Sequence, residues 1–123
     1  MDLATERCEA CRPDSPQVPV EDEQSLLARI PEWDLIEVDG VKRLQRVITL
    51  NGWRRAIALT NRISDLANEA GHHPALLTEW GKVTVQWWSH AIGGLHRNDF
   101  VMAAKVDALL AETQGVLHKR HSP

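Results

Sequence analysis

Residues 69–90 read EAGHHPALLTEWGKVTVQWWSH, and this stretch decides how the chain around it is organised. A helical pattern ends just before the adjacent His72 and His73, and Pro74 biases the residue before it towards an extended backbone. The two histidines are therefore predicted to lie in a loop. An alternating run then carries His90 back beside that loop, as in a β-hairpin.

Three neighbouring imidazoles indicate proton-transfer chemistry. The unperturbed pKa of histidine, roughly 6.5, lets the ring accept or donate a proton near neutral pH. The ordinary alternative for any single histidine is a surface or structural role. An adjacent pair before a proline is less ordinary, so we take His72, His73 and His90 as candidate catalytic residues.

Composition is that of one ordinary globular domain. The chain has 123 residues, of which 43% are hydrophobic and 25% charged. A net charge of -3 and a pI near 6.0 give no reason to expect nucleic acid or an anionic membrane as a partner. The sequence also has neither a membrane-spanning stretch nor a signal sequence, so we expect a cytoplasmic protein.

A single Cys8-Glu-Ala-Cys11 pair lies near the N-terminus. It supplies two ligands, whereas a structural zinc site needs four. His96, His118, His121 or a neighbouring subunit would have to complete such a site. We favour a reduced pair on an N-terminal arm.

The order of elements predicts an α+β fold. Residues 1–20 are predicted to be an arm, 21–117 a single domain and 118–123 a flexible tail. In the domain, a short helix capped by Asp22 or Ser25 precedes a hairpin of strands 33–38 and 41–50, joined by a turn at Asp39-Gly40. A helix from Trp53 follows and ends at Gly71.

A second hairpin and a last helix complete the pattern. Strands are predicted over 76–80 and 82–90, and the helix, capped by Asn98 or Asp99, is predicted to end at Gly115. The result is α-β-β-α-β-β-α, a four-stranded antiparallel sheet with helices packed on one face. The uncovered face would expose Trp88, which favours a stacked ligand or self-association.

Four ordered motifs give the sequence a clear resemblance. They are Gly71-His-His-Pro, Trp80-Gly-Lys-Val, Ser89-His90 and Gly94-Leu-His-Arg-Asn-Asp99. The chain resembles the pterin-4a-carbinolamine dehydratase family from about Pro31 through the last helix. Its cysteine-containing arm resembles bacterial members associated with phenylalanine hydroxylase.

The resemblance implies an enzyme that dehydrates 4a-hydroxytetrahydropterin to quinonoid dihydropterin, so that the pterin used by an aromatic amino acid hydroxylase is recycled. It implies no metal and no organic cofactor. It also implies a homo-oligomer, dimer or tetramer, with a functional link to phenylalanine hydroxylase.

The family's functional residues fall on matching positions of this sequence. The three family histidines match His72, His73 and His90. The substrate-binding residues are expected to be Glu69, Trp88, Ser89 and Asp99. The chain departs from the family at Asn68, where many members have a glutamate.

Two other functions remain open at this stage. One is a metal hydrolase with a zinc ion on the three histidines. The other is a protein-binding or regulatory module, a role that some animal members of the family also have. The acid and base roles of the individual histidines do not follow from the sequence.

Overall fold

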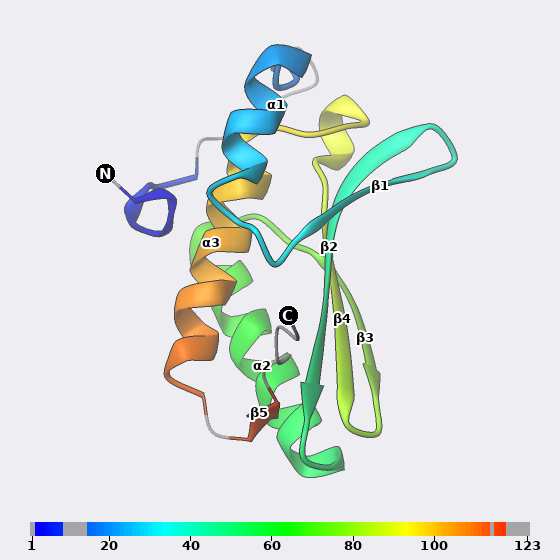
Figure 1. The fold of residues 1–123 in the computed structure, drawn as a ribbon, viewed down its shortest axis with the longest axis vertical. Coiled ribbons are helices and arrows are strands. Elements are labelled where there is room, and N and C mark those ends of the chain that lie inside the picture. The colour runs from blue at the N-terminus through cyan, green and yellow to red at the C-terminus, as the bar shows by residue number, and fades with distance from the viewer. Residues whose placement is uncertain (1, 9–14, 114, 118–123) are drawn as a thin grey trace, which may run out of the picture.

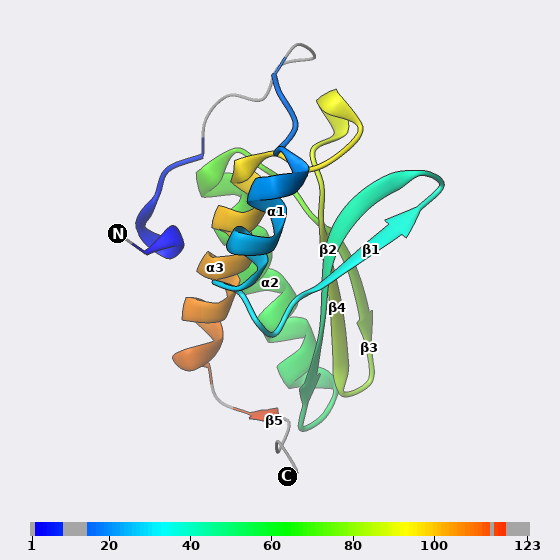
Figure 2. The same cartoon turned by 45° about the horizontal axis from the view of Figure 1, so that its top comes forward.

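Three helices cover one face of an antiparallel sheet in the computed structural model, which describes residues 2–8, 15–113 and 115–117 (Figure 1). Figure 2 shows the same two layers from a second direction. The helices are α1 (Val20–Leu27), α2 (Trp53–Ala70) and α3 (Arg97–Ala111). The strands are β1 (Asp34–Val38), β2 (Val41–Leu50), β3 (Ala75–Glu79), β4 (Lys82–Trp87) and β5 (Val116–Leu117). The predicted fold class is confirmed.

The two predicted hairpins form the sheet, whose strand order is β1-β2-β4-β3. The first hairpin turns at Asp39 and Gly40, which have φ values of 51° and 79°, as a two-residue turn of this kind requires. A fifth strand, β5, pairs with Thr49 and Leu50 at the end of β2. It was not predicted, because the last helix stops at Ala111 instead of continuing to Gly115.

The core lies between the sheet and the helices. Its largest buried side chains include Trp87, Phe100, Ile30, Leu44, Ile48, Leu59, Ile63 and Met102. One polar cluster borders this apolar layer: Arg46 of β2 pairs with Asp107 of α3, and the Trp33 indole donates to the same carboxylate at 2.8 Å. Arg46, a charged residue among the apolar residues of β2, therefore has a charged partner.

Two predicted helix caps are wrong. α1 begins at Val20 with Pro19 in the N-cap position, ahead of both Asp22 and Ser25. Three acidic residues then occupy its first turn, where they interact favourably with the helix dipole. α3 is capped by His96, because its Nδ1 atom accepts a hydrogen bond from the Asn98 N–H.

Residues 2–8 of the N-terminal arm pack along α3. A short 3₁₀ helix, Leu3–Thr5, buries Leu3 against the core, and Glu6 makes a two-point ion pair with Arg97. Cys11 and the predicted tail 118–123 lie outside the described residues. Within the described part of the chain, no helix is both long and apolar enough to cross a membrane.

Candidate active site

The end of α2 carries the histidine pair to the hairpin of β3 and β4. Gly71 has a left-handed φ of 69°, and its N–H bonds to the carbonyl of Asn68. The N–H of His72 bonds to the carbonyl of Ala67 at 3.2 Å. These two bonds form a Schellman motif, which ends the helix at the predicted glycine. Pro74 then leads the chain into β3.

His72 makes the strongest polar contact in the site. Its Nε2 atom lies 2.6 Å from Oδ1 of Asp99, a carboxylate with no exposed surface. The ring also stacks on Trp87, with centroids 5.7 Å apart and planes 10° from parallel. Because an ionised carboxylate only accepts hydrogen bonds, neutral His72 carries its proton on Nε2 and keeps a lone pair on Nδ1.

Asp99 lies in the first turn of α3 and is held in place by two further groups. Its Oδ2 atom accepts hydrogen bonds from the Ser89 hydroxyl and from the backbone N–H of His96, both at 2.9 Å. The His96 bond is half of the capping box of α3. Both carboxylate oxygens are therefore occupied by protein, and Asp99 is placed to orient His72.

His73 turns away from this cluster, back towards α2. Its Nε2 atom lies 2.9 Å from Oδ1 of Asn68, and both side chains are exposed. An amide oxygen accepts, so Nε2 donates and Nδ1 keeps the lone pair. Asn68 is thus the direct neighbour of a candidate histidine at the position where the resemblance leads one to expect glutamate.

His90 lies outside β4, and the prediction of a strand over 82–90 is wrong at this end. The strand stops at Trp87, because Ser89 instead pairs with Gly94. The chain between them forms a short 3₁₀ helix, His90–Ile92. The exposed His90 ring tilts against Trp88, with centroids 4.4 Å apart.

Trp88 also belongs to a polar cluster on the uncovered face of the sheet. The Arg43 guanidinium carbon lies 3.8 Å from the Trp88 ring centroid, and the same side chain donates to Gln86 at 3.0 Å. Gln86 in turn donates to Gln45. Trp88 is therefore half-buried, with the cationic Arg43 guanidinium over its ring and His90 beside it.

The candidate residues thus fall into separate groups. The first joins His72, Ser89 and Asp99, and the second joins Trp88 and His90. His73 pairs with Asn68. Glu69 is exposed and lines a cavity of about 510 Å³ with Cys8 and Lys105, which none of the three histidines lines. The sequence analysis considered His96 only as a possible metal ligand and did not predict that it caps α3, although an aspartate three residues after it is the spacing of a capping box.

The structure also bears on metal binding. Among the described residues, no three histidine, cysteine, aspartate or glutamate side chains are arranged to hold a metal ion. Cys8 is free and half-buried, and burial raises the pKa of its thiol to about 11. A neutral thiol is a poor metal ligand, since the thiolate is the form that binds.

Comparison with known proteins decides the family. Residues 16–109 match the sequence model of a family described as pterin 4 alpha carbinolamine dehydratase. The chain belongs to this family. A putative pterin-4-alpha-carbinolamine dehydratase 1 from Gloeobacter violaceus is 53% identical over 116 residues, which cover 94% of this chain and all of the relative.

Other members of the pterin carbinolamine dehydratase family are equally similar. The putative enzymes from Nitrosococcus oceani and Marinobacter nauticus are each 55% identical, over 89% and 87% of this chain and 96% of each relative. A crystal structure described as a transcriptional coactivator/pterin dehydratase from Brucella melitensis matches with a TM-score of 0.68. It is 21% identical and covers 76% of this chain and 98% of that chain, so it supports the fold alone.

Proposed function

We propose that this protein is a 4a-hydroxytetrahydropterin dehydratase, a hydro-lyase that releases water and quinonoid dihydropterin from its substrate. Membership of the family supports the reaction class. The observation that carries the proposal within the structure is the His72–Asp99 contact of 2.6 Å. It leaves Nδ1 of His72 without a protein partner among the described residues and open to solvent, as a proton acceptor must be.

The dehydration needs two proton transfers, for which two imidazoles are suited. A proton leaves the pterin ring nitrogen, and another reaches the departing hydroxyl, which leaves as water. We assign the first step to Nδ1 of His72, because Asp99 stabilises the imidazolium that forms. Protonated His90 donates to the hydroxyl, while His73 orients the ring.

The strand register brings the loop that carries His72 to the same end of the hairpin as His90, although His72 stacks on the buried Trp87 and His90 contacts Trp88, the next residue. Ala75 of β3 pairs with Gln86 of β4. Continued by three residues, the same antiparallel register places His72 opposite Ser89, whose next neighbour is His90. The loop and the end of β4 therefore approach each other at one end of the hairpin.

The reaction assay is stopped-flow decay of 4a-hydroxytetrahydropterin. Each general acid or base contributes roughly 10² to 10⁴ in rate, so His72→Ala and His90→Ala should each lower kcat by at least about 10². Asn61→Ala, on the exposed side of α2, is the control and should match the parent. Parent-like decay in both histidine variants would contradict catalysis at this site.

The alternative of a three-histidine hydrolase has no support in the geometry, since the three rings have three different neighbours. A role restricted to protein binding is not favoured by any contact of the described residues. Recycling of the pterin for phenylalanine hydroxylase, in the cytoplasm, remains part of the proposal for the enzyme.

Self-association is a further part of the proposal. The face of the sheet away from the helices carries exposed Val47 on β2 and Leu77 on β3, and the register places both opposite Thr84. An apolar row on an uncovered sheet favours burial against a second copy. Light scattering at micromolar concentration tests this, and a purely monomeric species would contradict it.

A further inference from the structure

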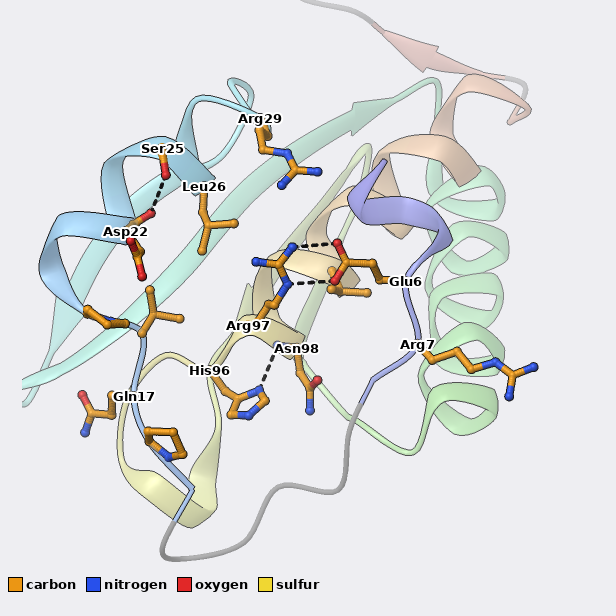
Figure 3. A pocket seen from close by; sticks show the side chains of 14 residues that line it. Glu6, Arg7, Gln17, Asp22, Ser25, Leu26, Arg29, His96, Arg97 and Asn98 are labelled. Carbon is orange, nitrogen blue, oxygen red and sulfur yellow. Dashed lines mark hydrogen bonds and ion pairs between the residues drawn. The ribbon is translucent and has the colours of Figure 1, made fainter. Parts of the chain in front are cut away.

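The segment just before α1 lies against the loop that carries His90. Figure 3 gives a close view of a cavity that Gln17 helps to line, and in it this segment runs beside the pale yellow loop that follows β4. Val18 packs against the core, and its N–H bonds to the carbonyl of Leu95 at 2.9 Å. A proline on either side of this pair of residues has a φ angle fixed by its ring. The segment is therefore well anchored beside the loop.

The hydrogen bonds within the turn that carries His90 are long. The N–H of Ile92 lies 3.3 Å from the carbonyl of Ser89. The N–H of Gly93 lies 3.3 Å from the carbonyl of His90 itself, and the N–H of Gly94 lies 3.4 Å from that of Ser89. A firm bond of 2.8 Å joins the Ser89 N–H to the Gly94 carbonyl, but it lies at the base of the turn. Because ordinary bonds of this kind end near about 3.2 Å, the turn is weakly held by its own contacts.

Gln17 holds this turn from outside. Its Nε2 atom donates to the carbonyl of Ile92 at 3.0 Å, a shorter bond than the three within the turn. Its amide also lies against Gly94, where an added Cβ would be 2.6 Å from Oε1 and 2.7 Å from Cδ of Gln17. Gly94 is not among the glycines with positive φ. The contact with Gln17, and not the backbone conformation, is therefore what requires a glycine at this position.

We propose that Gln17 is a positioning residue for the dehydration, which fixes the turn so that the His90 ring stays beside Trp88 and in place to donate its proton. This inference rests on the role proposed above for His90. A general acid acts only within hydrogen-bond reach of the group that it protonates, and a displacement of about 1 Å can cost about 10²-fold in rate. The segment before α1 thereby contributes to the reaction, although it carries none of the candidate histidines.

Kinetics of 4a-hydroxytetrahydropterin decay test this role. Gln17→Ala removes the donor, and Gln17→Glu keeps the shape of the side chain but replaces the amide N–H with an acceptor. Both should lower kcat by about 5-fold or more, the factor that one neutral hydrogen bond contributes to an equilibrium, with little change in KM. Gln24→Ala, on the exposed surface of α1, is the matched control and should behave as the parent. A parent-like kcat in both Gln17 variants would overturn the proposal.

A double-mutant cycle with Gly94 tests the contact itself. Gly94→Ala places a methyl group where the Gln17 amide lies, so it should displace the amide and lower kcat as Gln17→Ala does. The three nearest neighbours of that methyl group are all atoms of Gln17. In the Gln17→Ala background, Gly94→Ala should therefore lower kcat no further. Losses that multiply in the double variant would overturn the proposal, because they would mean that the two positions act independently.

Amide hydrogen exchange followed by NMR gives a measurement that needs no turnover. In Gln17→Ala, the N–H groups of Ile92, Gly93 and Gly94 should exchange about 5-fold faster than in the parent, while those of α3 should not change. Faster exchange with a parent-like kcat would overturn the positioning role, and unchanged exchange would overturn the support of the turn by Gln17. Failure of the proposed reaction would give a different result, namely parent-like decay in His90→Ala.

Discussion

Nε2 of His72 and Oδ1 of Asp99 lie 2.6 Å apart, while the other oxygen of Asp99 accepts hydrogen bonds from the Ser89 hydroxyl and from the backbone N–H of His96, the N-cap of α3. One carboxylate thus joins the loop before β3, the end of β4 and the start of α3. The contact fixes both the position of the imidazole and the nitrogen that carries its proton. The sequence resemblance implied substrate binding by Asp99, but its contacts favour positioning of His72.

Asp99→Asn should therefore lower kcat by roughly 10² or more, with little change in KM. An amide at position 99 can donate a hydrogen bond, whereas the carboxylate only accepts. The proton of the neutral His72 ring is then no longer held on Nε2. Steady-state kinetics of pterin dehydration measures the effect. Asp107→Asn is the matched control, because it removes a second carboxylate from α3 that touches no candidate histidine. Equal losses of kcat in both variants would indicate damage to the helix.

The contact between Asn68 and His73 predicts an effect on substrate binding. Asn68→Ala removes the amide oxygen that lies 2.9 Å from Nε2 of His73, so the imidazole assigned to orienting the pterin ring loses its partner. The KM for the pterin should therefore rise several-fold with little change in kcat, as steady-state kinetics measures. Asn61→Ala elsewhere on α2 is the control and should leave both constants unchanged. An unchanged KM in Asn68→Ala would contradict the orienting role of His73.

Much of the fold could be predicted because its signals are local. Asp39-Gly40 and Gly71 adopt the positive φ values that their turn and cap require, and each signal needs only its immediate neighbours. β5 has two residues, too few to show a period, and it exists only through pairing with the distant end of β2. No local pattern could have predicted it.

The candidate site shows the same contrast between local signals, which could be predicted, and long-range contacts, which could not. The histidines are visible in the sequence, and the motif spacing pointed to Asp99. The end of β4 was missed because alternation continues through His90, whereas the pairing of Ser89 with Gly94 bends the chain. The contact of His72 with Asp99 joins residues 27 positions apart, so only the packed helix and sheet could reveal it.

Asp107 should make stability depend on pH. Burial raises the pKa of this carboxyl above its ordinary value, although the Trp33 hydrogen bond and the Arg46 charge oppose the shift. The folded protein therefore holds the proton more tightly than the unfolded chain, and this contribution to stability is lost as pH rises above 3.8. Urea unfolding of the parent and of Asp107→Asn between pH 4 and neutrality measures this effect. The free energy of unfolding of the variant should increase relative to that of the parent as pH rises. A constant difference would contradict the raised pKa.

Cys8 should react slowly with alkylating reagents in the folded protein. Burial raises the pKa of its thiol from 9.0 to about 11, with the negative charge of Asp99 acting in the same direction and Lys105 against it. Only the thiolate is nucleophilic, so at pH 8 the folded protein should react roughly 100-fold more slowly than the urea-unfolded chain. Peptide-resolved mass spectrometry after iodoacetamide treatment measures Cys8 separately from Cys11.

The pH dependence of this reaction separates a raised pKa from simple shielding of the sulfur. If the pKa controls the rate, alkylation of folded Cys8 continues to accelerate up to about pH 11, whereas that of the unfolded chain levels off above pH 9. Shielding alone would lower the alkylation rate of folded Cys8 at every pH and leave the midpoint of its pH dependence near 9. The same shift predicts that the free energy of unfolding decreases as pH rises from 9.0 to about 11, because the unfolded chain loses this proton first. Cys8→Ala should remove that part of the decrease.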